Sequence, residues 1–252
     1  MTTELFINLA YVLAAVLFIF GLKLLSSAAT ARKGNLVSAV GMFVAVVVTL
    51  LDQAIVSFQW IALGVAIGTV IGVLGARLVA MTAMPEMVAL FNGFGGLASL
   101  LVGWAALYEH EMSLFTLITV ALSILIGGLT FTGSMIAYGK LSERISGKPV
   151  QFAGQQVVNG LLVIAIVGSA VMFCRDPSDH TWLYALVTLS FLFGIMAVIP
   201  IGGADMPVVI SLLNSYSGLA ACAAGFAVNN MILIVSGALV GASGIILTQI
   251  MC

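Results

Sequence analysis

Charged residues are scarce in this chain. Only 7% of its 252 residues are Asp, Glu, Lys or Arg, whereas 62% are hydrophobic and the mean hydropathy is +1.26. A soluble domain usually has about 25% charged residues. The composition therefore excludes a soluble globular protein and indicates one that crosses a membrane several times. The formal net charge of −1 also leaves no basic surface for nucleic acid.

Cysteine is rare as well, and the usual catalytic motifs are missing. The three cysteines are too few and too scattered for a disulfide framework or a metal-ligand cluster; they are Cys174, Cys222 and Cys252. Glu109-His110-Glu111 has metal-like residue types, but one His between two acids is most often a solvated turn. Because no Walker, Ser-His-Asp, Cys-His or zinc-ligand arrangement occurs, we expect no catalytic residue, no metal and no bound cofactor on this chain.

Long apolar runs make up almost the whole sequence. Nearly every segment between charges has the roughly 20 residues that cross about 30 Å of hydrocarbon as a helix. The runs predict nine helices over residues 5–25, 35–51, 54–76, 84–107, 113–138, 155–174, 181–199, 206–227 and 231–250. Since no stretch is rich enough in Pro or Ser to be a linker, we predict one all-α transmembrane domain over residues 1–252, a bundle of about nine transmembrane helices.

The basic residues orient these predicted helices. Only Arg175 falls on one side of the membrane, and the other seven fall in loops on the opposite side. The seven are Lys23, Arg32, Lys33, Arg77, Lys140, Arg144 and Lys148. The positive-inside rule assigns their side to the cytoplasm. We therefore expect the N-terminus outside, the C-terminus in the cytoplasm, and the chain in the cell inner (plasma) membrane.

The sequence stops at Met251-Cys252, at the end of an apolar helix and without a charged flank. A cytoplasmic terminus usually continues into polar residues. We therefore expect a soluble cytoplasmic domain to follow Cys252 in the full-length protein.

Two stretches 122 residues apart repeat each other, from Met84 and from Met206. Each begins with Met-Pro and carries a lone Asn, at Asn92 and Asn214, inside an apolar or small-residue run. Four spans separate the two helices, so they run in the same direction. Each Asn lies eight residues beyond its Met, about 12 Å deep at 1.5 Å per residue. An amide at that depth is costly in lipid unless it has a partner, a water or a function.

The two Asn residues have two interpretations. They either clamp helices together by hydrogen bonds worth under about 2 kcal/mol each, or they hold or gate a chain of waters. Their matching depth, and the hydroxyl groups around Asn214, favour a hydrated path. Because an amide does not titrate at ordinary pH, neither Asn92 nor Asn214 is itself the proton carrier.

Six further residues are candidates for the same function. Glu86 and Asp205 lie at the cytoplasmic ends of helices, where they either cap the helix or form the ionisable ends of a proton path. Ser134 adds a hydroxyl near a third cytoplasmic helix end. The glycines of the last predicted helix share one face, which indicates close helix packing, with a hinge beside a polar path as the alternative. They are Gly237, Gly241 and Gly244.

Several motifs together resemble one protein family. They are Thr82–Ala89, Thr130–Ser134 with Tyr138–Leu141, Ala204–Val209, Leu213–Gly218 and Gly237–Gly241. Over nearly its whole length, the chain resembles the membrane domain of the beta subunit of proton-translocating NAD(P) transhydrogenase.

This resemblance implies a machine that couples hydride transfer between NADH and NADP+ to proton movement across the membrane. It implies an NADP(H)-binding domain after the last helix, with the NAD(H) domain and further membrane helices in an alpha subunit. It also implies a dimer of the alpha–beta unit. By motif match, residues implicated in proton passage or in coupling are Asn214, Asp205, Ser134, Gly237, Gly241 and Gly244.

One position departs from the family pattern. Many relatives have a His, regarded as a proton-channel residue, where this chain has Asn92. Either another subunit supplies the titratable His, or water and Asp205 or Glu86 carry the proton. Two functions from other classes stay open: a stand-alone secondary transporter built on the parallel repeat, and a purely structural membrane anchor.

Overall fold

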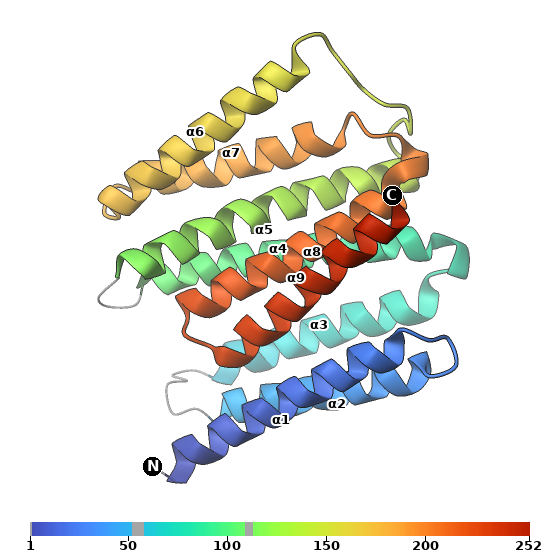
Figure 1. Ribbon diagram of the computed structural model, residues 1–252, viewed down its shortest axis with the longest axis vertical. Helices are drawn as coiled ribbons and strands as arrows, with labels where there is room; N and C mark the ends of the chain where they lie inside the picture. Colours follow the sequence, from blue (N-terminus) through green and yellow to red (C-terminus); the bar gives the residue numbers. More distant parts are fainter. Residues whose placement is uncertain (1, 52–57, 109–112) are drawn as a thin grey trace. The chain divides into compact units, whose positions relative to one another are not determined.

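The computed structural model describes residues 2–51, 58–108 and 113–252 (Figure 1). In these ranges no strand occurs, and nine helices are long and apolar enough to cross a membrane. They are α1 Thr2–Leu25, α2 Ala31–Leu50, α3 Phe58–Leu78, α4 Met84–Ala105, α5 Leu114–Leu141, α6 Gln155–Arg175, α7 His180–Val198, α8 Met206–Ala227 and α9 Met231–Met251. The predicted all-helical membrane fold is confirmed for these ranges, and the orientation of the termini stays a prediction.

The helix starts follow local capping chemistry. Pro85 and Pro207 lie in the first turns of α4 and α8, where a missing N–H costs nothing. Each of these helices follows a short 3₁₀ turn, Met81–Ala83 or Gly203–Asp205. The Ser113 side chain accepts a hydrogen bond from the backbone of α5, and the Asn230 side chain does the same for α9.

Several helix boundaries differ from the predicted ones by a few residues, and two of them have the same cause. The second helix begins at Ala31 rather than at residue 35, and the fifth ends at Leu141 rather than at residue 138. Charged residues were taken as breaks, but Lys and Arg are good helix formers and continue the helix. Arg32 and Lys140 accordingly lie within helical turns. The predicted start of the third helix, at residue 54, lies outside the described residues.

The chain divides into two compact units, Met1–Val79 and Ala80–Cys252. In the first unit α1 packs along α2, and the hydroxyl groups of Tyr11 and Thr49 lie 3.0 Å apart across that contact. Within the described residues, α3 has no buried side chain. Such an exposed apolar surface is typical of a helix that faces lipid or another membrane helix. The prediction that residues 1–252 form one domain stays a prediction.

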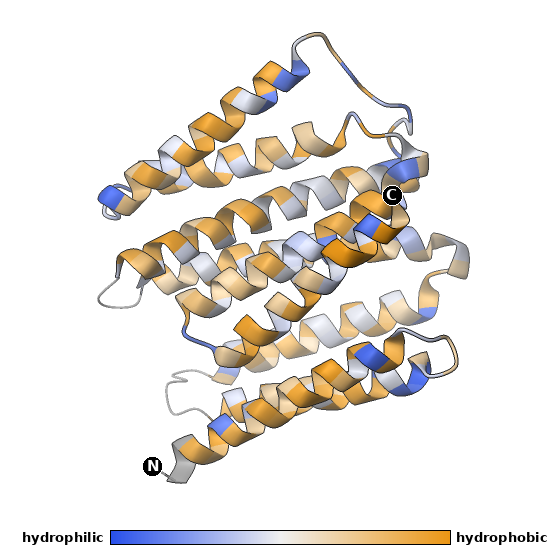
Figure 2. Cartoon of the chain, in the orientation of Figure 1, coloured by the Kyte–Doolittle hydropathy of each residue, from blue (hydrophilic) through white to orange (hydrophobic). Residues whose placement is uncertain are grey.

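In the second unit α5 is the central helix. It packs against α4, α6, α7 and α8, while α4 also contacts α8, and α9 lies along α8 (Figure 1). One apolar cluster includes Ile124 and Leu186, and another includes Met206 and Leu213. Apolar residues run along every helix and the most hydrophilic ones gather toward the helix ends (Figure 2). The packing therefore brings α4, α5 and α8 together along their length.

Candidate functional site

Three polar side chains form a hydrogen-bonded chain across α4, α5 and α8. The Asn92 Nδ2 donates to Ser134 Oγ at 3.0 Å, and Ser217 Oγ donates to Asn92 Oδ1 at 2.9 Å. Ser134 is fully buried, whereas Asn92 and Ser217 are half-buried. The Asn92 amide is thus satisfied at both its nitrogen and its oxygen. That bonding offsets the cost of placing an amide among apolar helices.

Glycines bring α4 and α5 close enough for this contact. A Cβ on Gly93 would lie 3.1 Å from the Cβ of Ser134, and one on Gly96 would lie 2.9 Å from the backbone oxygen of Gly127. Any larger residue at either position would push the helices apart. The small residues that follow Asn92 therefore set the distance at which its amide reaches Ser134.

Asn214 lies in a different environment from Asn92. Its side chain is exposed on α8, and none of the residues that the structure describes forms a hydrogen bond with it. It is three residues from Ser217, so the two side chains are neighbours on the helix surface. Asn214 is therefore placed at the outer edge of the Ser217–Asn92–Ser134 chain, and the structure does not bring the two amides into contact.

The two predicted acidic residues also differ from each other. Asp205 occupies the N-cap position of α8, but its exposed carboxylate makes no capping hydrogen bond, so that interpretation was wrong for the side chain. Glu86 is half-buried in the first turn of α4. It precedes Asn92 by six residues, about 9 Å of helical rise.

The predicted glycine face of α9 lies against α8. Gly237, Gly241 and Gly244 are all buried there. A Cβ on Gly244 would lie 2.8 Å from the Cβ of Ser215, and the Ser215 hydroxyl donates to the backbone oxygen of Gly241. The glycines therefore let the two backbones approach closely, and their role in coupling stays a prediction.

Lys140 is a residue whose importance the sequence did not reveal. Only 3% of its surface is exposed, at the last turn of α5. Its ammonium donates to the backbone oxygens of Ile199 and Ile201, each at 2.6 Å, and more weakly to that of Lys148 at 3.4 Å. It thereby holds the connection from α7 to α8, which carries Asp205. In the sequence its positive charge was used only to assign one side of the membrane to the cytoplasm.

The described residues contain no metal-ligand cluster, and the one dinucleotide-like motif lies inside a helix. They contain no group of three His, Cys, Asp or Glu side chains that would hold a metal, and residues 109–112, which include Glu109-His110-Glu111, lie outside the described part. Gly93 to Ala98 matches the loose dinucleotide pattern G-x-G-x-x-A, but it lies inside α4. A pyrophosphate site needs a strand, a turn and then a helix start.

Comparison with known proteins assigns the chain to a family. A family model described as NAD(P) transhydrogenase beta subunit matches residues 7–252. The chain belongs to this family. It is 46% identical to the NAD(P) transhydrogenase subunit beta of Rhodospirillum rubrum, over 96% of this chain and 54% of the relative. A second curated sequence of that name, from a designated strain of the same species, gives the same values.

Membership of the NAD(P) transhydrogenase beta subunit family confirms the resemblance seen in the motifs. It gives no support to a stand-alone transporter. The chain spans about half the length of the curated relatives it matches.

Proposed function

We propose that this chain is the proton-translocating membrane part of an NAD(P) transhydrogenase. Proton passage through it is coupled to hydride transfer between NADH and NADP+, which takes place in soluble domains outside this chain. A domain after Cys252 binds NADP(H), and the alpha subunit binds NAD(H). The observation that carries this proposal is the Ser217–Asn92–Ser134 hydrogen-bonded chain inside the helices of a transhydrogenase beta subunit.

The proton path follows that chain of side chains. Hydroxyl groups both donate and accept, so Ser134 and Ser217 orient waters on either side of the Asn92 amide. The amide positions those waters but does not titrate. Glu86 and Asp205, which carry the charge at the cytoplasmic ends of α4 and α8, are the ionisable groups of this chain at the path.

The exposed Asn214 favours completion of the path by another subunit. An amide facing lipid is costly, and a polar partner helix or a water-filled seam removes that cost. The alpha subunit contributes additional membrane helices against this face of α8, and one of them supplies the titratable His that Asn92 replaces. The complete enzyme is a dimer of the alpha–beta unit in the inner (plasma) membrane.

Coupling reaches the NADP(H) domain through the cytoplasmic ends of α8 and α9. Moving one charge through about 100 mV is worth roughly 2.3 kcal/mol, which is the energy to be transmitted per proton. The glycine contact at Gly237, Gly241 and Gly244 makes α8 and α9 a closely packed pair that moves together. The Lys140 contacts join α5 to the start of α8.

The test is proton pumping by variants of the full-length enzyme in sealed vesicles. Asn92→Leu and Asn214→Leu should each abolish pumping driven by hydride transfer, while the subunits still assemble. Asn159→Leu makes the same change in α6, away from the path, and should pump normally. Full pumping by Asn92→Leu and Asn214→Leu, with assembly intact, would contradict the proposed path.

A further inference from the structure

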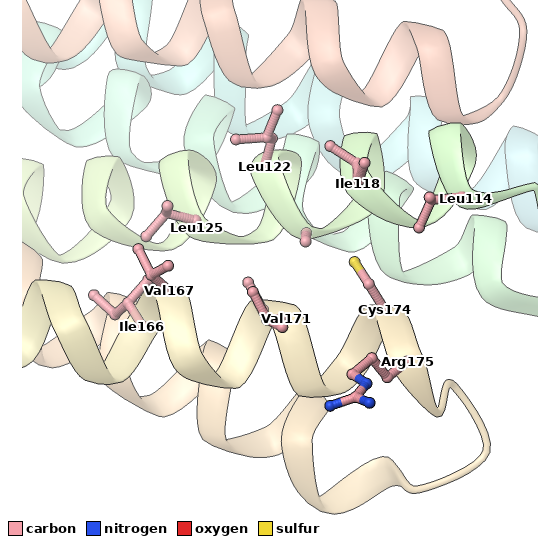
Figure 3. Close-up of a pocket in the computed structure, with 11 residues that line it drawn as sticks. Leu114, Ile118, Leu122, Leu125, Ile166, Val167, Val171, Cys174 and Arg175 are labelled. Atoms are coloured by element: carbon pink, nitrogen blue, oxygen red, sulfur yellow. The ribbon is translucent and has the colours of Figure 1, made fainter.

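An apolar groove of about 410 Å³ lies between α5 and α6 in the second unit (Figure 3). Its floor includes Ala121 and Ile166, which are only 6% and 2% exposed. Its rims include Leu122 and Val171, which are 43% and 53% exposed. Among the described residues that line it, the one with a charge is Arg175, the last residue of α6. The groove is thus hydrophobic along its length and cationic at one end.

The length of the groove matches one leaflet of a bilayer. Leu114 begins α5 and Arg175 ends α6, and both lie at the same end of the groove (Figure 3). From Leu114 to Leu125 the rise is about 16 Å, and from Ile166 to Arg175 about 14 Å. Each value is close to half of the roughly 30 Å hydrocarbon thickness. The groove therefore extends from one membrane surface to about the middle of the membrane.

We propose that this groove binds one phospholipid, with an acyl chain between α5 and α6 and its phosphate on Arg175. An empty apolar gap forfeits dispersion contacts, and a water there would find no polar partners along its walls. The volume lies within the range of about 300–1,000 Å³ that is usual for small-molecule sites. A guanidinium is the side chain that pairs best with a phosphate, because its donors match two phosphate oxygens at once.

The residues after Arg175 select the headgroup. Asp176 and Asp179 follow it, so the mouth of the groove carries both signs of charge. Asp179 accepts hydrogen bonds from Thr181 in the first turn of α7. One oxygen of Asp176 accepts from the backbone of Ser178, and its other oxygen is able to accept from a ligand. Phosphatidylethanolamine matches this pattern, since its phosphate meets Arg175 and its primary ammonium meets an acid. A headgroup with a net negative charge would meet the same acids without an ammonium.

Photolabelling of the full-length enzyme in vesicles tests the proposal without measuring pumping, so its result is separate from that of the proposed function. The probe is phosphatidylethanolamine with a diazirine at the end of one acyl chain, and mass spectrometry maps the labelled residues. In the unaltered enzyme, label should appear at the inner end of the groove, on Leu125, Ile166 and Val167. The matching phosphatidylglycerol probe should label these residues less strongly.

Two variants should weaken the labelling by different means. Arg175→Gln removes the phosphate partner from an exposed position and should reduce labelling about tenfold, as expected for loss of a charge-assisted contact. Ala170→Phe fills the groove and should reduce labelling to a similar extent. The controls are Arg77→Gln, the same change in the last turn of another helix, and Val163→Phe on the exposed surface of α6 outside the groove. Both controls should label like the unaltered enzyme.

Several outcomes would overturn the proposal. Equal labelling of the unaltered enzyme and the Arg175→Gln variant would contradict the proposed contact between Arg175 and the phosphate. Equal labelling by a diacylglycerol probe with the same acyl chain would contradict it too. Stronger labelling by phosphatidylglycerol than by phosphatidylethanolamine would contradict the headgroup assignment. No labelling of the groove in the assembled enzyme would show that a protein partner, rather than a lipid, fills it.

Discussion

The helices α4 and α8 begin alike but use their amides differently. Both follow a short 3₁₀ turn, start with Met-Pro and carry an Asn eight residues later. In α4 the Asn is next to the glycine face that packs on α5, so its amide is directed into the unit. In α8 the neighbouring residues Leu213 and Ser215 are buried, and Asn214 between them is exposed. A repeat in sequence therefore specifies depth and direction, but neighbouring helices decide which amide is enclosed.

The comparison also separates two kinds of polar residue. The Asn92 amide has its partners within this chain, and it holds three helices in register. Asn214 has none among the described residues and is exposed on α8, and the proposed function assigns its partner to the alpha subunit. One half of the repeat thus closes a network, and the amide of the other half stays open in the second unit.

The largest effect is expected from removing the Lys140 ammonium. Its hydrogen bonds hold the connection that leads into α8, and among the described residues α4 has no such support. Lys140→Met would leave three backbone oxygens without their ammonium donor and should lower the free energy of unfolding by about 3 kcal/mol. The measurement is unfolding of the purified full-length subunit by a denaturing detergent. Lys148→Met is the control, because the side chain of Lys148 is exposed and only its backbone oxygen takes part. Equal stability of the two variants would show that the Lys140 hydrogen bonds do not stabilise the protein.

The next effect distinguishes the two faces of α4. Gly96→Leu would force α4 away from Gly127 on α5 and should destabilise the protein by about 1–3 kcal/mol, as overpacking does. Gly95→Leu changes the adjacent glycine, whose Cβ would meet no atom within 4 Å, and should be tolerated. Yield of folded, assembled enzyme and resistance to unfolding measure the difference. If both variants behave alike, the glycine contact does not set the Asn92 geometry.

A smaller effect compares the two amides directly. Asn92→Leu should lower the free energy of unfolding of the full-length beta subunit by about 1 kcal/mol, because it removes hydrogen bonds to α5 and α8. Asn214→Leu should leave stability unchanged or raise it slightly, since its exposed amide has no partner among the described residues. The same denaturation assay reports both. A greater loss of stability from Asn214→Leu than from Asn92→Leu would contradict the assignment of the enclosed and the open amide.

The smallest effect concerns the start of α7, where the Asp179 side chain accepts a capping hydrogen bond. The Asp205 side chain at the start of α8 accepts none from the described residues. Hydrogen bonds from the Thr181 side chain and backbone lower the pKa of Asp179, which caps α7 outside the membrane span. Because its folded pKa is below the ordinary value near 3.9, Asp179 stabilises the protein at neutral pH, and this stabilisation is lost as the pH falls through the lowered pKa. Asp179→Asn should weaken the acid dependence of unfolding.

Much of the architecture was predictable from the sequence. Apolar runs of spanning length located nine helices, since the bilayer core imposes both a length and a need for internal backbone hydrogen bonds. Helix ends were misplaced where a charged residue was assumed to end the helix, as at Lys140 in α5. Asn92 and Ser134 were both recognised as candidates from their residue type and position. That they contact each other was not predictable, because they are 42 residues apart and meet only through helix packing.

Membrane location, helix order and the positions of the polar residues along each helix were determined by the sequence alone, because hydropathy and helical rise are properties of local segments. Only the tertiary structure decided that Asn92 is enclosed while Asn214 is exposed, and that Ser217 joins the network. It also decided that Lys140 is buried against backbone oxygens. These outcomes depend on which face of each helix meets a neighbour, and that choice arises from close packing between segments distant in the chain.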